Sequence, residues 1–247
     1  MSDPRFNGLV AVVTGGQSGI GAACADRLRE LGAEVAVFDR DAAAGDLSFA
    51  VDVTDEQAVA DAVASVIAQT GRIDILVNSA GIGAAGTIAE NDNAEWRRVL
   101  EINVIGTANV IRACLPHLIA SPSASVVNVA SAVSLTGFPN RVLYTASKGA
   151  VLSMTRAMAA DHLRDGIRFN AVCPGTTETP WIGRLLDSAD DPSAARAALE
   201  ARQPHGRLIA ADEVAEAVSY LAGPRSGSTN GVALSVDAGI ESIYVAD

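Results

Sequence analysis

A serine, a tyrosine and a lysine in the second half of the sequence could together perform acid–base chemistry. Tyr144 and Lys148 are four residues apart, so they share one face of a helix. A free tyrosine has a pKa of about 10 and is a poor base at neutral pH, but a neighbouring ammonium group favours its phenolate form. Ser131 follows a predicted strand and can donate a hydrogen bond to a substrate oxygen. The set predicts proton transfer at a carbonyl or alcohol, the alternative being a packed tyrosine and a solvated lysine.

A glycine-rich turn near the N-terminus has the spacing of a phosphate-binding loop. The segment Thr14–Gly21 follows a predicted strand and opens a predicted helix. Glycine lets the backbone turn sharply and approach a pyrophosphate, and the helix N-terminus supplies free N–H groups and a positive dipole end. We predict a dinucleotide site here, the alternative being a tight turn without a ligand. The predicted contact residues are Gly15, Gln17, Ser18, Gly19, Ile20 and Gly21.

An aspartate at the end of the second predicted strand indicates which dinucleotide binds. The carboxylate of Asp39 can accept hydrogen bonds from an adenosine ribose diol and repels a 2′-phosphate, which favours NAD over NADP. Arg40 follows directly and could serve a 2′-phosphate, although Asp39 would still oppose it. The alternative is a surface ion pair between Asp39 and Arg40. We include both residues among the cofactor contacts.

Four arginines and a tryptophan are candidates for the substrate end of the site. A guanidinium fork suits a carboxylate, and Arg141 lies only three residues before Tyr144. The alternative is that the arginines pair with surface acids such as Asp187, Asp190 or Glu200. Besides Ser131 and Tyr144, the predicted substrate contacts are Arg141, Trp181, Arg184, Arg202 and Arg207.

Short apolar runs that alternate with helical patterns must position these residues. Runs that are apolar on both faces are typical of parallel strands covered by helices on each side. The predicted fold is a doubly wound α/β domain of the Rossmann type, with a seven-stranded parallel sheet and helices on both faces. The predicted strands are Leu9–Thr14, Glu34–Asp39, Ser48–Asp52, Ile73–Asn78, Ser125–Ala130, Arg168–Cys173 and Val232–Val236. The predicted helices are Gly19–Leu31, Asp55–Thr70 with Thr54 as its N-cap, Ala94–Ile119, Tyr144–Leu163 and Asp212–Ala222.

The chain reads as a single domain over residues 1–247, without a linker or a repeat. The segment of residues 176–208 fits the alternation worst, because it is long and rich in Arg, Asp and Ala. We predict that it forms a mobile lid over the substrate.

Composition excludes several classes of protein. Hydrophobic residues make up 49% and charged residues 19%, so the chain can bury a core, and the net charge of −11 disfavours nucleic acid and anionic lipid. We do not expect the polar N-terminal residues to act as a signal peptide, and we see no apolar run of membrane-spanning length. Three scattered cysteines indicate reduced thiols in a cytoplasmic protein, and three scattered histidines suggest no metal site.

In order and spacing, these motifs resemble the short-chain dehydrogenase/reductase family in its compact form, over nearly the whole chain. The glycine turn reads T-G-x-x-x-G-x-G, and Ser131, Tyr144 and Lys148 match the catalytic set. The segment Asn78–Gly81 matches N-N-A-G except for Ser79. By the resemblance, Asn103 joins the catalytic residues, and the further cofactor contacts are Asp52, Val53, Asn78, Ala80, Gly81, Tyr144, Lys148, Pro174, Gly175, Thr177 and Thr179.

The resemblance implies an NAD-dependent oxidoreductase that interconverts a secondary alcohol and a ketone. It further implies that Asn103 holds a water molecule that relays protons from Lys148. The N-R-x-x-Y and R-Q-P-x-G-R segments resemble a subgroup that acts on small hydroxy or keto acids, such as 2-keto-3-deoxy-sugar-acid and 3-hydroxybutyrate dehydrogenases. The helices Ala94–Ile119 and Tyr144–Leu163 carry many small residues, and the family commonly forms tetramers through them, so we expect a homotetramer.

Two other functions remain open at this point. One is NADPH-dependent reduction of a 3-oxoacyl thioester, against which Asp39 argues. The other is a cofactor-sensing module without turnover, which predicts loss of Tyr144 or Lys148, whereas both are present.

Overall fold

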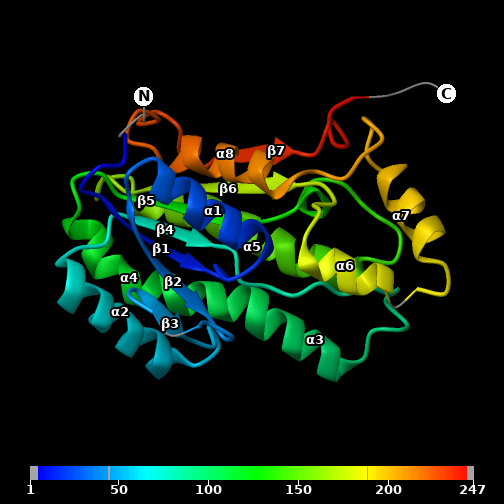
Figure 1. The fold of residues 1–247 in the computed structure, drawn as a ribbon, viewed down its shortest axis with the longest axis horizontal. Helices are drawn as coiled ribbons and strands as arrows, with labels where there is room; N and C mark the ends of the chain where they lie inside the picture. Colours follow the sequence, from blue (N-terminus) through cyan, green and yellow to red (C-terminus); the bar gives the residue numbers. More distant parts are fainter. Residues whose placement is uncertain (1–4, 44, 188, 244–247) are drawn as a thin grey trace.

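A seven-stranded parallel sheet forms the centre of the molecule (Figure 1). The structure is a computed structural model that describes residues 5–43, 45–187 and 189–243. The strand order β3-β2-β1-β4-β5-β6-β7 confirms the predicted doubly wound fold. The strands are β1 (Val10–Thr14), β2 (Glu34–Asp39), β3 (Ser48–Ala50), β4 (Ile75–Asn78), β5 (Ser125–Val129), β6 (Arg168–Pro174) and β7 (Ala233–Val236). Their ends differ from the predicted ones by at most two residues.

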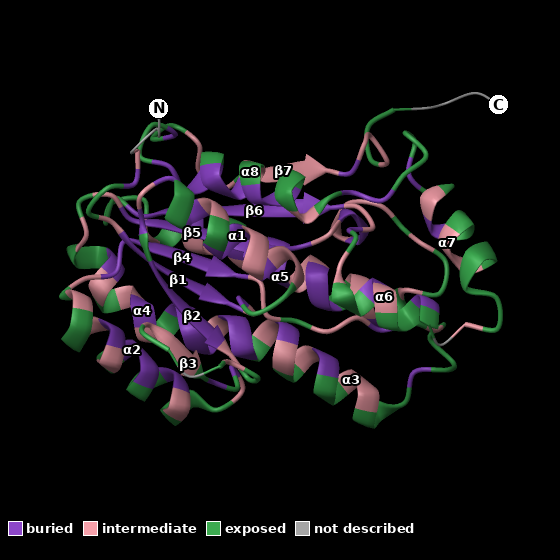
Figure 2. Cartoon of the chain, in the orientation of Figure 1, coloured by how far each residue is buried: buried purple, intermediate pink, exposed green. Residues whose placement is uncertain are grey.

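Alternate side chains of each central strand enter two separate cores. In β1, Val10 and Val12 pack on one face of the sheet, and Ala11 and Val13 pack on the other. All are buried, which is why the strands read as continuous apolar runs (Figure 2). Burying a valine side chain contributes about 1.5–3 kcal/mol, so the two cores hold the sheet rigid beneath its carboxyl-terminal edge.

Two layers of helices cover the sheet. Helices α1 and α8 pack together on one face, and α2, α4 and α5 cover the other. The helices are α1 (Gly19–Glu30), α2 (Glu56–Thr70), α3 (Asn93–Leu100), α4 (Thr107–Ala120), α5 (Val142–Asp161), α6 (Pro180–Asp187), α7 (Pro192–Glu200) and α8 (Ala211–Ala222). Asp55 caps α2 by accepting a hydrogen bond from the Ala58 N–H at 3.0 Å, so the prediction of Thr54 as N-cap is wrong. Thr54 instead donates its hydroxyl to Asp52.

The long helix predicted at Ala94–Ile119 consists of α3, a π-helical stretch (Glu101–Gly106) and α4 in direct succession. By length and composition this helix could cross a membrane, contrary to our expectation from the sequence, since an 18-residue window has a mean hydropathy of 1.3. Its buried residues pack against the sheet and α2, as in a core helix, which passes the same test. Its π-helical stretch is a local widening of the kind that often accompanies functional sites.

The segment of residues 176–208 contains two short helices, α6 and α7, beside the carboxyl ends of the strands (Figure 1). They pack against each other through Ile182, Leu186, Leu199 and Leu208, a small core of their own. Local burial therefore holds α6 and α7 together, and the movement of the segment as a lid remains a prediction.

Candidate active site

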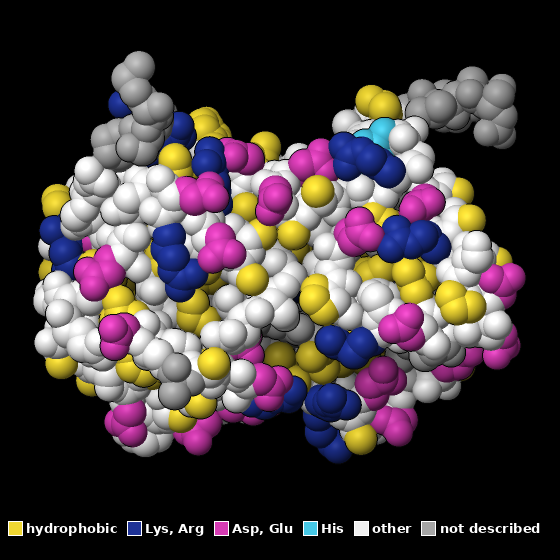
Figure 3. Space-filling model, in the orientation of Figure 1, with side chains coloured by type: hydrophobic (Ala, Val, Ile, Leu, Met, Phe, Trp, Pro, Cys, Tyr) yellow, Lys and Arg dark blue, Asp and Glu magenta, His cyan; other side chains and the backbone are white. Residues whose placement is uncertain are grey.

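A cavity of about 460 Å³ opens at the carboxyl ends of the strands, and residues of α6 form part of its wall. Figure 3 shows the hollow, with hydrophobic side chains in its floor and basic side chains at its edge. Most of the predicted site residues line it. They are Gly15, Ser18, Gly19, Ile20, Asp39, Arg40, Asp52, Val53, Ala80, Gly81, Ser131, Arg141, Tyr144, Lys148, Pro174, Gly175, Thr177, Thr179, Trp181, Arg184 and Arg202.

Helix α5 presents Tyr144 and Lys148 to the cavity on one face. The Lys148 Nζ lies 6.0 Å from the centre of the Tyr144 ring and donates a hydrogen bond to the Val129 carbonyl oxygen at 2.8 Å. Lys148 is only 6% exposed, and burial lowers its pKa to about 8, with a smaller opposing effect from Cys173. A buried cation with one carbonyl partner is well placed to stabilise an anion on the neighbouring phenol.

Three influences act on the Tyr144 phenol. Burial raises its pKa, while a hydrogen bond with Ser131 and the positive charge of Arg141 lower it. Ser131 lies directly after β5, at the N-cap of a short 3₁₀ turn, where it also accepts a hydrogen bond from the Val133 N–H at 3.4 Å. Ser131 and Tyr144 are therefore in contact, and burial makes the phenol dependent on nearby cations for ionisation.

Asn103 lies in the π-helical stretch and supports the catalytic residues without lining the cavity. Its amide nitrogen donates to the Ile82 carbonyl and the Ser147 hydroxyl, and its oxygen accepts from the Ile82 N–H at 2.8 Å. Asn103 thus joins the turn after β4 to helix α5 one residue before Lys148. It positions the catalytic helix, and the water relay remains a prediction.

The glycines of the turn are required by close contacts. Gly15 has a φ of +67°, and a Cβ there would lie 3.0 Å from the Ala80 Cα, while a Cβ on Gly21 would overlap the Gly15 carbonyl oxygen. Gly19, with a φ of +56°, lies against Thr179 of the segment after β6. Gly21 does not line the cavity, so it closes the turn rather than contacting a ligand.

The part of the cavity beside β2 and the glycine turn is acidic. Asp39 accepts hydrogen bonds from the Gln17 N–H at 3.1 Å and the Asp41 N–H at 3.0 Å. The Gln17 side chain does not line the cavity. Arg40 forms an exposed ion pair with Asp41 at 3.4 Å, so the suggested pairing of Arg40 with Asp39 is wrong. Hydrogen bonds from Thr54, and then the charge of Arg40, lower the pKa of Asp52.

Asn78 is buried behind the cavity and does not line it. Its amide nitrogen donates to the Asn128 Oδ1 at 2.9 Å and so connects β4 to β5. The next turn is held instead by the Thr14 hydroxyl, which accepts from the Ser79 and Ala80 N–H groups. Its backbone passes the cavity, which explains why a serine at position 79 is tolerated.

The substrate end brings together three of the four predicted arginines. Arg141 donates to the Ala84 carbonyl at 3.1 Å, and burial first, then the charge of Arg202, lowers its pKa. Arg184 of α6 also lines the cavity. Arg207 does not, because both of its terminal nitrogens bind Glu213 at 2.7 and 2.8 Å, so its assignment to the substrate is wrong.

A family model described as "Enoyl-(Acyl carrier protein) reductase" matches residues 15–241. The chain belongs to the short-chain dehydrogenase/reductase family. It is an oxidoreductase of the CH–OH group, and members of this family use nicotinamide cofactors.

Relatives cover nearly the whole chain. A cis-4-hydroxycyclohexanecarboxylate dehydrogenase of Sinomonas cyclohexanicum is 40% identical, over 96% of this chain and 98% of its own. A 2-(R)-hydroxypropyl-CoM dehydrogenase of Xanthobacter autotrophicus is 40% identical, over 92% and 96%. The solved aldohexose dehydrogenase of Thermoplasma acidophilum is 30% identical with a TM-score of 0.91, and the match covers 100% of this chain and 98% of that one.

The cavity of this dehydrogenase fits a nicotinamide dinucleotide. The turn at Gly15 and Gly19 leaves bare backbone at the N-terminus of α1, where a pyrophosphate would bind. Asp39 and Lys148 line the same cavity, so one elongated ligand can reach both. Among the described residues there is no cluster of His, Cys, Asp and Glu that could hold a metal ion.

Several site residues had no signal of their own in the sequence. Gln203 is 2% exposed, and its Oε1 accepts from the Thr176 N–H at 3.3 Å and lies 2.5 Å from where a Cβ on Gly175 would be. The only hint was a polar residue inside the R-Q-P-x-G-R segment. Phe138, Leu199 and Ile240 also line the cavity, and nothing in their local sequence indicated it.

Proposed function

We propose that this enzyme is an NAD-dependent dehydrogenase that oxidises the secondary alcohol of a small hydroxy acid or sugar acid. The observation that carries the proposal is that one cavity is lined by Asp39, by the Ser131–Tyr144–Lys148 set and by three arginines that form no ion pair with any described residue. Arg141 is close enough to Tyr144 for its charge to lower the tyrosine pKa. A carboxylate held by Arg141 therefore places the attached hydroxyl near the phenol.

The chain's own residues can remove the alcohol proton. Ser131 donates a hydrogen bond to the substrate oxygen, and the Tyr144 phenolate accepts the hydroxyl proton. Lys148 stabilises the phenolate by its charge, and Asn103 holds the helix that carries both residues. A bound nicotinamide ring supplies the hydride acceptor and adds positive charge beside the phenol. In reverse, the neutral phenol returns its proton to the carbonyl oxygen.

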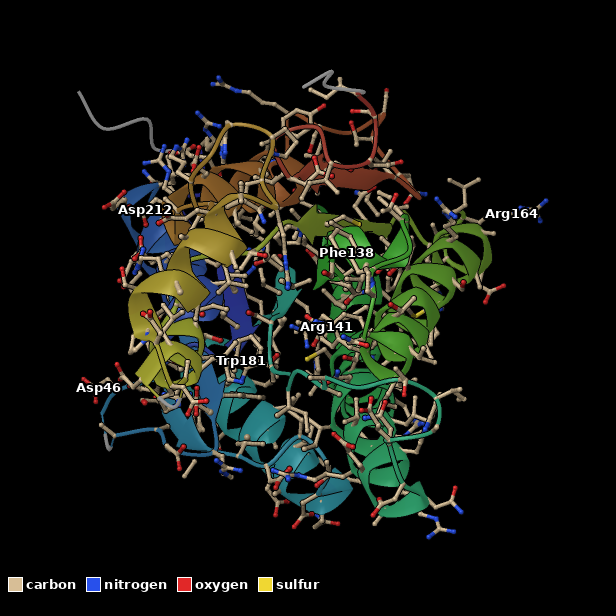
Figure 4. The ribbon with its side chains drawn as sticks, turned by 90° about the vertical axis from the view of Figure 1, so that its right-hand side faces the viewer. Asp46, Phe138, Arg141, Arg164, Trp181 and Asp212 are labelled. Atoms are coloured by element: carbon tan, nitrogen blue, oxygen red, sulfur yellow. The ribbon has the colours of Figure 1, made fainter. Side chains whose placement is uncertain are left out.

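The cofactor preference for NAD rests on Asp39. Its carboxylate points at the adenosine end, where a 2′-phosphate would meet Asp39, Asp41 and Asp52 together. We expect Asp39→Ala to lower the ratio of kcat/KM for NAD over NADP by about tenfold or more. The matched control is Asp46→Ala, an exposed aspartate at the edge of the molecule (Figure 4). A wild-type enzyme that prefers NADP would contradict the assignment.

The substrate class is tested by removing the negative charge. The substrate after which the Sinomonas relative is named contains a carboxylate, and here Arg141, Arg184 and Arg202 form no ion pair with any described residue. We expect cis-4-hydroxycyclohexanecarboxylate to be oxidised with a kcat/KM at least about tenfold above that of its methyl ester. Equal values for acid and ester would refute the proposal. Arg141→Met should erase the difference, whereas Arg164→Met, at the periphery in Figure 4, should preserve it.

A second candidate is NADPH-dependent reduction of a 3-oxoacyl thioester, which shares only the acyl-thioester class of substrate with the description of the matching family model, an enoyl-(acyl carrier protein) reductase. It requires a 2′-phosphate beside Asp39. Consumption of NADPH with acetoacetyl-CoA, faster than any NAD-dependent oxidation of a hydroxy acid, would establish it instead.

We also propose that the enzyme works in the cytoplasm. Cys24, Cys114 and Cys173 are free and buried, and burial raises the pKa of the Cys24 and Cys114 thiols to about 12. Such thiols stay protonated and suit a reducing compartment. Cell fractionation should recover the native protein with cytoplasmic markers, and recovery in the membrane fraction would contradict this.

A further inference from the structure

The polar side chains that line the outer half of the cavity can donate hydrogen bonds but cannot accept them. We define it by the cavity-lining residues of the turn after β4 (82–84), the loop before α5 (133–141), the α6–α7 segment (181–202) and Ile240. Among the described residues of this half, the side chains that can hydrogen-bond are three arginines and the indole N–H of Trp181. All of these groups donate, and none accepts. The remainder is aliphatic or aromatic, as at Phe138, Leu185, Leu199 and Ile240.

The carboxylates that line the cavity lie elsewhere. Asp39, Asp41 and Asp52 belong to the adenosine end, beside the glycine turn. Some backbone acceptors of the outer half are already engaged, since the Ala84 carbonyl accepts from Arg141 at 3.1 Å and the Ile82 carbonyl accepts from Asn103 at 2.9 Å. A group that must donate a hydrogen bond therefore finds no side-chain partner there, whereas a group that only accepts finds several.

Shape adds to this chemistry. The Trp181 ring packs against Gly83 so closely that a Cβ on Gly83 would lie 2.6 Å from the ring. Phe138, Arg141 and Trp181 lie around the central opening in Figure 4, so the arginine faces the cavity between two aromatic side chains. Ile182 and Leu199 are 4% and 8% exposed, so this wall is built on a packed core rather than on solvated side chains.

We propose that the substrate is a hydroxy acid with a hydrocarbon body, alicyclic or branched, whose only hydroxyl is the reacting one. This rests on the proposed function and narrows it: the outer half excludes sugar acids. A carboxylate is an acceptor without hydrogens and matches the arginines, and the hydrocarbon body matches Phe138, Trp181 and Leu199. Each additional hydroxyl of a sugar acid would enter this half with a hydrogen that no side chain accepts. The enzyme therefore discriminates against sugar acids, because their additional hydroxyls lose water on binding and gain no hydrogen-bond acceptor.

Two acids with the same ring test the inference. Quinate carries the ring and carboxylate of cis-4-hydroxycyclohexanecarboxylate with additional hydroxyls. With NAD, we expect kcat/KM for the alicyclic acid to exceed that for quinate by about 100-fold or more, since each unpaired hydroxyl costs on the order of tenfold. Quinate or gluconate oxidised as well as the alicyclic acid would overturn the inference, while the ester comparison above still supports the proposed function. Oxidation of no acid at all would refute both.

A variant pair in the cavity wall checks the cause. Phe138→Asn adds an acceptor to the outer half and should lower the preference for the alicyclic acid over quinate by about tenfold, whereas Phe138→Leu should keep it. Calorimetric titration in the presence of NAD compares the binding affinities of cyclohexanecarboxylate and quinate, and it does not depend on turnover. Tighter binding of quinate would overturn the inference, even if both variants were unstable.

Discussion

At the scale of single residues, catalysis depends on a phenol whose ionisation is controlled by its surroundings. Burial opposes the Tyr144 phenolate, while Ser131, Arg141 and the adjacent Lys148 favour it. We expect Tyr144→Phe to lower kcat by about 10²–10⁴-fold, because the carboxylates that line the cavity, Asp39, Asp41 and Asp52, lie beside the glycine turn and cannot replace the phenol as the proton acceptor. NAD affinity, measured by fluorescence titration, should be unchanged. A variant with near-normal kcat would remove Tyr144 from the mechanism.

Burial of the Lys148 ammonium group lowers the free energy of unfolding by an amount that depends on pH. Burial lowers its pKa from 10.5 to about 8, so below about pH 8 both folded and unfolded chains carry the proton and the full penalty applies. Between about pH 8 and 10.5 the unfolded chain binds more protons, so stability rises with pH. We expect Lys148→Met to be inactive but more stable at pH 7 by up to ~3 kcal/mol, with the gain shrinking above pH 8. Urea unfolding at pH 7 and pH 9.5 measures this, and a gain that did not shrink would contradict it.

At the scale of elements, two links between segments hold the site. Asn103 joins the π-helical stretch to the turn after β4, and Gln203 joins the end of α7 to the segment after β6. Neither side chain lines the cavity. Asn103 binds the backbone of Ile82, which does line it, and Gln203 directly follows Arg202, which also does. The site is therefore assembled by amide side chains that cross between elements.

The Gln203 link predicts a specific kinetic effect. Gln203 follows Arg202, so loss of its hydrogen bond to the Thr176 N–H should release Arg202 from its position. We expect Gln203→Leu to raise KM for a hydroxy acid by about five- to tenfold, with kcat nearly unchanged and KM for the methyl ester unaffected. A merely structural role would lower stability and change both KM values equally. Gln203→Glu, which keeps an acceptor, should retain most of the affinity.

At the scale of the whole molecule, we propose a homotetramer formed through α4 and α5. Ile105, just before α4, is 45% exposed and Ile119 48%, and a Cβ on Gly149 of α5 would meet no atom within 4 Å. Gly149→Trp should therefore leave the isolated chain folded but block close approach of a second copy. Light scattering should give a tetramer for the wild type, a smaller species for this variant and an unchanged mass for Gly149→Ala. A monomeric wild type would refute the proposal.

The sequence by itself determined the sheet, the glycine turn and the catalytic set. The continuous apolar runs of the strands, the steric need for Gly15 and Gly19, and the helical spacing of Tyr144 and Lys148 are local properties that a short stretch of chain expresses wherever it folds.

Only the tertiary structure decided which arginines face the cavity and what surrounds them. Arg202 lines the cavity and Arg207 does not, although they are close in sequence, because Glu213 at the start of α8 binds Arg207. Ile240 reaches the cavity because β7 ends beside β6. Such choices depend on the directions of side chains relative to partners far along the chain, and composition and periodicity do not contain them.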